Sequence, residues 1–173
     1  MTTGKYSNSV IYRRHSVRNY TKDPLSADQL EHILHAGMAG PSAHNMQPWS
    51  FDVIDEQKLL DVIAMKHPYG KMIDKAHLAV LVLVKKDVSM KDPFYQQDLG
   101  AAVENMLLAA TECGVGSCWC GVHPVKEVEK IFVDLLNIPD DLFPFCVIAF
   151  GIPDKEREPS DRFEESRIHR NAW

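Results

Sequence analysis

DLGAAVENMLLAATECGVGSCWCGV, residues 98–122, places a long apolar helix before a glycine-rich turn and a short strand. Apolar side chains recur at helical spacing over residues 98–113 and form one wide face. They are Leu99, Ala102, Val103, Met106, Leu107 and Ala110. Gly114 supplies the stop at the C-terminal end of this helix, and residues 118–122 are expected to form a short strand or turn. The pattern predicts a central core helix.

Helices and strands alternate on both sides of this stretch. Ser26 and Gln29 have the spacing of a capping box. The helix behind them must end by Gly40-Pro41, because proline disfavours helical geometry in the residue before it. Further helices are predicted at 8–14, 56–66 and 125–136, and strands at 49–53, 78–84 and 145–150. The alternation predicts a layered α/β sandwich in a single domain, residues 1–173.

Composition narrows the classes of partner. The chain has 173 residues, a length that is typical of one domain. It contains 19 Lys and Arg and 24 Asp and Glu, which give a net charge of −5. Nucleic acid and anionic membranes are therefore disfavoured as partners. The longest strongly apolar run, residues 78–84, is far shorter than the roughly 20 residues of a membrane helix. We expect a cytoplasmic protein whose four cysteines are reduced thiols.

A basic cluster, RRHSVR, occupies residues 13–18 near a predicted chain reversal. Arginine side chains donate paired hydrogen bonds to phosphate, so three guanidinium groups in an acidic protein predict a local anion site. The spacing alone fits a solvated basic helix end equally well. The role of the cluster therefore stays open at this point.

Two further segments could contact a ligand. The loop PSAHNMQPW, residues 41–49, is stiffened by two prolines and carries serine and amide groups that suit a planar ligand. It also fits a plain connection, with Trp49 in the core. The turn GVGSCWCG, residues 114–121, lets a ligand approach the main chain closely. Its spacing is not that of a Rossmann fingerprint, and it follows a helix rather than opening one.

The sequence gives weaker support for a metal site or for a redox pair of thiols than for a ligand site. Cys118, Cys120 and His123 are three soft ligands, but structural zinc sites usually have a second ligand pair, and none exists here. His32 and His35 lie three residues apart on a predicted helix and could chelate a metal, but such histidines are more often plain surface residues. The Cys-x-Cys spacing is not that of a thioredoxin-type redox pair. No metal is therefore expected.

Taken together, these segments resemble the FMN-dependent nitroreductase family over essentially the whole chain. Residues 14–18, RHSVR, are similar to its R-[RH]-S-x-[RK] motif, and residues 41–49 are similar to its P-S-x-x-N-x-Q-P-W loop. Residues 98–121 resemble its central helix and flavin-ring turn, and residues 151–157, GIPDKER, its terminal strand and Lys-x-Arg. The resemblance implies an α/β (α+β) fold. This is a three-layer α-β-α sandwich with a mixed central sheet and a C-terminal arm, residues 153–173, exchanged with the partner subunit.

The resemblance also implies which residues bind FMN in a homodimer with the cofactor at the interface. One end of FMN and its phosphate would be held from both chain ends, by Arg14, His15, Ser16, Arg18, Lys155 and Arg157. The partner subunit would contribute Ser42, Ala43 and Asn45. Main-chain N–H groups of Cys120 and Gly121 would face flavin N5 and O4. No side chain is assigned as catalytic, and Arg18 would stabilise the reduced ring electrostatically.

The implied activity is hydride transfer from NAD(P)H through FMN to a nitroaromatic, quinone or similar electron-poor small molecule. Two alternatives stay open. One is an FMN-binding storage or redox-sensing module without turnover, and the other is a specialised relative such as a reductive dehalogenase. Cys120 stands where a bulkier aliphatic residue is common, and residues 85–97 are short beside relatives with a long substrate lid. These departures leave the substrate open.

Overall fold

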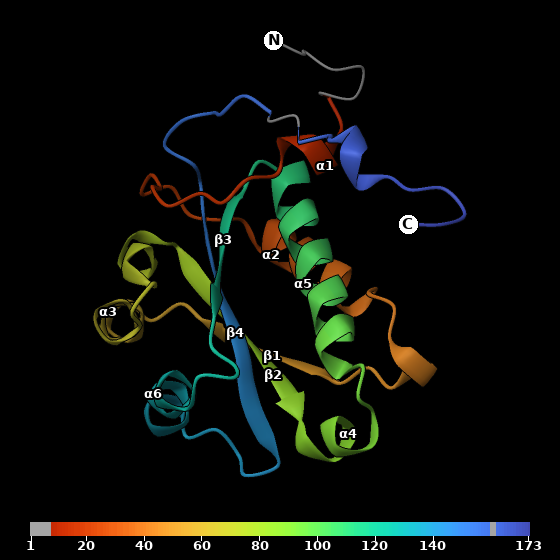
Figure 1. Cartoon of the computed structure of the whole chain (residues 1–173). Helices are drawn as coiled ribbons and strands as arrows, with labels where there is room; N and C mark the ends of the chain where they lie inside the picture. The colour runs from red at the N-terminus through yellow and green to blue at the C-terminus, as the bar shows by residue number, and fades with distance from the viewer. Residues whose placement is uncertain (1–7, 160–161) are drawn as a thin grey trace.

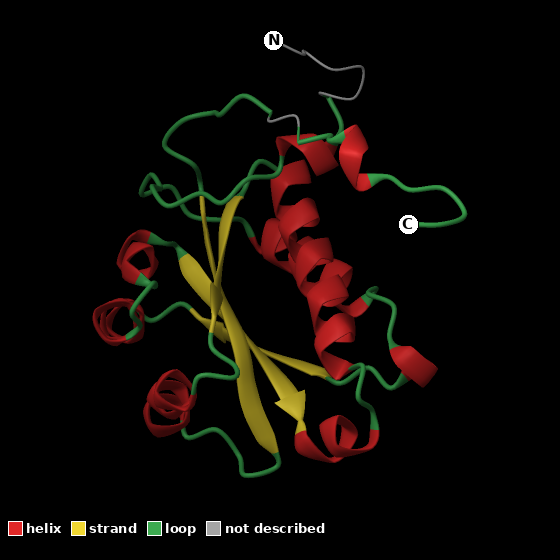
Figure 2. Ribbon diagram, viewed as in Figure 1, coloured by secondary structure: helices red, strands yellow, loops and turns green. Residues whose placement is uncertain are grey.

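The computed structural model describes residues 8–159 and 162–173. A sheet forms the middle layer, and helices pack on both of its faces (Figure 1, Figure 2). Its strands are β1 (Trp49–Ile54), β2 (Leu78–Lys85), β3 (Gly116–Gly121) and β4 (Leu142–Gly151). The predicted three-layer α-β-α sandwich is therefore confirmed.

The strands lie in the order β1-β2-β4-β3, and each neighbouring pair is antiparallel. This corrects the expectation of a mixed sheet: the parallel pairing within the described residues is an isolated bridge between Ser16 and Ser117. β2 and β4 lie in the centre, and every residue of β2 except Lys85 is buried. β3 lies at an edge, so one row of its backbone groups has no strand partner.

Two hydrophobic cores lie on the two faces of the sheet. α2 (Ala27–Met38) and α5 (Tyr95–Glu112) cover one face, and α3 (Gln57–Lys66) and α6 (Lys126–Leu136) cover the other (Figure 1). Successive side chains of a strand point to opposite faces, so Val80 and Val82 belong to the first core and Ala79 and Leu81 to the second. Each fully buried valine or leucine stabilises the fold by about 1.5–3 kcal/mol.

α5 is the predicted core helix. Its buried face contains all six of the predicted side chains, Leu99, Ala102, Val103, Met106, Leu107 and Ala110. The helix begins at Tyr95, three residues before the predicted start. α2 packs closely against it because two glycines lie at the contact. A Cβ atom on Gly37 would lie 2.8 Å from Met106 Cγ, and one on Gly40 would lie 2.9 Å from Ala102 Cα.

The helix boundaries follow the sequence signals in most places. The capping box is confirmed, because Ser26 Oγ accepts from Gln29 N (3.1 Å) and Gln29 Oε1 accepts from Ser26 N (2.8 Å). The N-terminal helix, α1, is shorter than predicted and spans Val10–Arg13. Residues 85–97 form the end of β2, a short helix α4 (Lys86–Lys91) and the start of α5. The short 3-10 helices are η1 (Ala43–Asn45), η2 (Lys71–Lys75) and η3 (Glu165–Arg167).

Beyond β4 the chain runs to the end of the molecule at which α1 lies (Figure 1). Every residue from 162 to 173 is exposed, as expected for an arm with few contacts in its own subunit. Its exchange with a partner subunit stays a prediction. Across residues 8–159 and 162–173, no helix combines the length and the hydropathy needed to cross a membrane.

Candidate functional site

The N-terminal segment packs along one end of the sheet. Val17 N donates to Ser117 O at 2.9 Å, which fastens this segment to the start of β3. Two glycines permit the close contact, because a Cβ atom on Gly116 would lie 2.9 Å from Val17 Cβ and one on Gly151 would lie 2.7 Å from the Tyr20 ring. The sequence therefore brings the basic cluster against the segment that follows β4.

Two adjoining pockets, of about 490 and about 210 Å³, lie where these segments meet. The larger falls within the usual range of roughly 300–1,000 Å³ for small-molecule sites. Both are lined by His15, Val17, Lys155, Glu156 and Arg157. Ser16 and Arg18 line the smaller pocket, and Arg13 lines the larger. We call these two pockets together the basic pocket.

Four Arg and Lys side chains of the basic pocket are available to a ligand, and Arg13 is one of them. Within the part of the chain that the structure describes, Arg18, Lys155 and Arg157 have no carboxylate within ion-pair distance. Glu156 and Glu158 also line the larger pocket, so its charge is mixed. Unpaired guanidinium and ammonium groups around a cavity are a suitable donor set for phosphate.

Of the FMN-binding residues predicted at the basic pocket, Arg14 is the one whose side chain lies outside it. Its Nε is 3.4 Å from Glu104 Oε1 on α5, and its side chain lines neither part of the basic pocket. Arg13 lines the larger pocket instead. His15 Nδ1 lies 3.0 Å from Arg13 O. The structure thus brings His15, Ser16, Arg18, Lys155 and Arg157 together without Arg14.

The free edge of β3 leads away from the basic pocket. In an antiparallel pair, alternate residues direct their N–H and C=O groups toward the neighbouring strand. Ser117 O accepts from Val17 N and so points away from β4, whereas Val122 N donates to Phe145 O of β4 at 3.2 Å. Both hydrogen bonds fix the same alternation along β3.

This alternation separates the two main-chain donors predicted from the sequence. It directs the N–H of Gly121 away from β4 and the N–H of Cys120 toward β4. A Cβ atom on Gly121 would meet no atom within 4 Å, so the space over this residue is open. The geometry supports Gly121 as a donor to a ligand, whereas the N–H of Cys120 is directed into the sheet.

The loop before β1 lies at the other end of α5. Ala43 N donates to Asp98 Oδ1 at 3.0 Å in the first turn of α5, whereas Thr111, near the last turn, lines the basic pocket. Within one chain, Ser42, Ala43 and Asn45 are therefore not brought to that pocket. The role of Asp98 was not predicted, because an acidic residue in a first helical turn is already explained by the helix dipole.

The same loop has an unusual backbone. His44, Asn45 and Gln47 have φ values of 52°, 55° and 46°, a region that residues with side chains seldom adopt. Ser42 Oγ accepts from Gln47 N (3.0 Å) and Asn45 Oδ1 accepts from Gln47 Nε2 (3.3 Å), which holds the loop in place. Such strain is typical of functional segments.

The cysteines lie in the protein interior and do not form a metal site. All four are free, and Cys118, Cys120 and Cys146 are buried. Burial raises the pKa of the Cys146 thiol well above its usual value, which disfavours the reactive thiolate. Over residues 8–159 and 162–173, no group of three or more His, Cys, Asp or Glu side chains is arranged to hold a metal ion.

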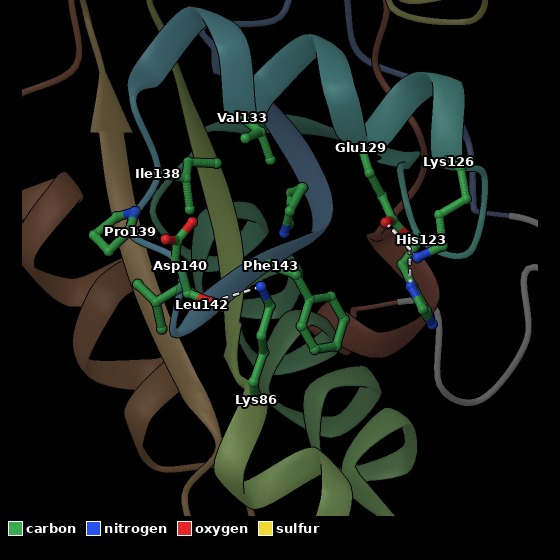
Figure 3. A pocket seen from close by; sticks show the side chains of 11 residues that line it. Lys86, His123, Lys126, Glu129, Val133, Ile138, Pro139, Asp140, Leu142 and Phe143 are labelled. Atoms are coloured by element: carbon green, nitrogen blue, oxygen red, sulfur yellow. Dashed lines mark hydrogen bonds and ion pairs between the residues drawn. The ribbon is translucent and has the colours of Figure 1, made fainter.

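Figure 3 shows a separate pocket, of about 260 Å³, between α6 and the first residues of β4. Lys126 Nζ lies 2.7 Å from Glu129 Oε2, Glu129 Oε1 lies 2.7 Å from His123 Nδ1, and His123 Nε2 lies 3.2 Å from Tyr95 OH. Burial opposes ionisation of Glu129, but the hydrogen bonds from Lys126 and His123 outweigh it and lower its pKa. This network was not predicted, although Lys126 and Glu129 lie three residues apart, a helical spacing that could have indicated their ion pair.

Comparison with known proteins gives consistent matches over nearly the whole chain. The sequence model described as the nitroreductase family matches residues 11–87 and 56–152. A protein of Archaeoglobus fulgidus, named as a candidate NADH dehydrogenase/NAD(P)H nitroreductase, is 40% identical over 95% of this chain and 97% of its own.

Two solved structures are similar as well. A protein of Clostridium acetobutylicum, described as a candidate NADH oxidase, is 33% identical with a TM-score of 0.91, over 95% of this chain and 100% of its own. A candidate nitroreductase of Desulfovibrio desulfuricans, solved in complex with FMN, is 30% identical with a TM-score of 0.79, over 95% of both chains.

Proposed function

Because the chain belongs to the nitroreductase family, we propose that it is an FMN-dependent oxidoreductase that passes hydride from NAD(P)H through flavin N5 to an electron-poor acceptor. Nitroaromatics and quinones are the acceptor classes that we propose. The similar Desulfovibrio desulfuricans protein was solved with FMN. The observation that carries the proposal is that residues of the segments 13–18 and 153–159 together line the basic pocket.

The residues present fit FMN. Lys155 and Arg157 form a donor set for a phosphate, and the open space over Gly121 admits a planar ring to the backbone. Ser117 Oγ is buried and lacks a hydrogen-bond partner among the described residues, so it can bond to a bound group. Ser117 and Gly121 lie on the same strand, β3, whose first residue, Gly116, lines the basic pocket.

FMN supplies the hydride chemistry at N5 when it is bound. In our proposal, His15, Lys155 and Arg157 hold its phosphate, and the Gly121 N–H binds the ring edge. Arg18 stabilises negative charge on the reduced ring. Arg14 and Ser16 stay proposed ligands; for Arg14 this requires its guanidinium to exchange Glu104 for the phosphate. We assign no side chain as general acid or base.

We also propose that the protein is a homodimer with FMN at the interface. Ser42, Ala43 and Asn45 lie far along α5 from the basic pocket, which suits a contribution to the partner's cofactor rather than to their own. In the arm, Ile168 and Trp173 are 53% and 99% exposed. Packing against a second subunit would remove this apolar surface from water.

A cytoplasmic location is part of the same proposal. It is supported by the four cysteines, which are all free thiols. Free thiols are typical of reducing compartments, whereas oxidising compartments favour disulfides.

The test begins with the visible spectrum of the purified protein, which should show a flavin band. Anaerobic addition of NADH or NADPH should bleach this band, and a quinone should support steady oxidation of the nicotinamide. Absence of flavin after both purification and reconstitution would overturn the proposal. Bound FMN that neither nicotinamide reduces would instead support a storage or sensing module.

A further inference from the structure

His67 contacts the free edge of β3 at the residue where we place the flavin ring. It is 3% exposed and directly follows α3. Its Nδ1 accepts a hydrogen bond from Tyr69 N at 3.1 Å, so the ring proton lies on Nε2. Nε2 then donates to Gly121 O at 3.0 Å. Burial lowers the pKa of His67, which favours the neutral form with this single donor.

The imidazole is held on several sides. Gly70 N donates to His67 O at 3.1 Å, and a Cβ atom on Gly70 would lie 2.9 Å from His67 Cβ. The Phe132 ring packs edge-on against the imidazole, with the centroids 6.2 Å apart. Cys120 Sγ lies 3.7 Å from Tyr69 O, which ties the same turn to β3. The orientation of the His67 donor is therefore fixed by its surroundings.

Gly121 needs such a constraint more than other residues of β3. It is the last residue of the strand, and glycine has the widest backbone freedom of any residue. Its N–H and C=O both point to the free side of β3, where no strand fixes them. His67 supplies a partner for the carbonyl and leaves the N–H available.

We propose that His67 is a positioning residue of the cofactor site, which holds Gly121 so that its N–H faces the edge of the flavin ring. This inference rests on the proposed function, because the ring is that of FMN. Simple filling of the core would be served as well by an apolar side chain. The single N–H of His67, which is held in place and bonds to the carbonyl of Gly121, instead fixes the orientation of the Gly121 backbone.

Two substitutions separate the hydrogen bonds of His67. Asparagine in His67→Asn keeps an acceptor close to the position of Nδ1 but is too short to reach Gly121, whereas glutamine in His67→Gln places an N–H donor close to the position of Nε2. FMN is titrated into each FMN-free protein and followed by flavin fluorescence. We expect the dissociation constant of His67→Asn to rise about 3- to 10-fold, and that of His67→Gln to stay within about twofold of the wild type.

The spectrum and the stability complete the test. The flavin band of bound FMN should shift in His67→Asn and keep its wild-type position in His67→Gln. Equal FMN affinities for the two variants, whatever their thermal stabilities, would overturn the inference. Should His67→Asn not fold, Gly70→Ala presses on the imidazole through its new methyl group and should weaken FMN binding; unchanged affinity there would also overturn it. Failure of the wild type to bind FMN would instead refute the proposed function.

Discussion

Gly121→Ala should leave the FMN-free protein stable and weaken its binding of FMN. A Cβ atom at this position would meet no atom within 4 Å, so the methyl group enters open space. Surface substitutions of this kind usually change the free energy of unfolding by no more than about 0.5 kcal/mol. In the complex, however, the methyl group would occupy the space where we place the flavin ring.

The expected loss follows from that overlap. Forcing extra atoms into a packed site costs about 1–3 kcal/mol. Since about 1.4 kcal/mol is a factor of ten, the dissociation constant of FMN should rise about 5- to 150-fold. Fluorescence titration of FMN measures the affinity, and urea unfolding of the FMN-free protein measures the stability.

Gly116→Ala is the matched control on the same strand. Its Cβ atom would lie 2.9 Å from three atoms of Val17, so this substitution should destabilise the FMN-free protein itself, by about 1–3 kcal/mol. Wild-type FMN affinity in Gly121→Ala, or a loss of stability equal to that of Gly116→Ala, would refute the placement of the ring over Gly121.

Three further predictions follow from the site and its surroundings. Lys155→Ala and Arg157→Ala should each weaken FMN binding by about 1.5–3 kcal/mol, since each removes a charge-assisted hydrogen bond to phosphate; unchanged flavin content would contradict this. Glu129 has a lowered pKa, so its contribution to stability is present above its unfolded-state pKa of roughly 4.3 and is lost as the pH falls through its folded-state pKa. Thermal unfolding from neutral to acidic pH should therefore show a smaller loss in Glu129→Gln than in the wild type. Removal of residues 159–173 should convert dimers to monomers in light scattering, and a dimer that persists would show that the arm is not needed.

Local patterns predicted most of the helices and strands. The apolar spacing of α5 depends on neighbours along one helix, and Gly114 ends it with a φ of 78°, as glycine allows. The start of α5 was placed too late, because residues 95–97 continue the helix beyond the predicted apolar face. Antiparallel pairing was not evident, since the periodicity of a strand does not specify the direction of its neighbour.

Only part of the site was predicted, because its residues are far apart along the chain. A family motif suggested that Lys155 and His15 meet, whereas neither local spacing nor charge indicates a contact between segments so far apart along the chain. The exchange of Arg14 for Arg13 depends on the position of Glu104, which only the packing of α1 against α5 reveals. His67 has no sequence signal, because a single histidine beside a proline suggests no partner.

The edge position of β3 has a consequence for solubility. An open sheet edge can pair with other chains and lead to aggregation. In this protein the Val17 segment covers one end of the edge and His67 occupies the other, on a strand of only six residues. The interval between them is too short for another polypeptide strand of about five or six residues. The contacts at the two ends of β3 therefore discourage intermolecular β-pairing along its free edge.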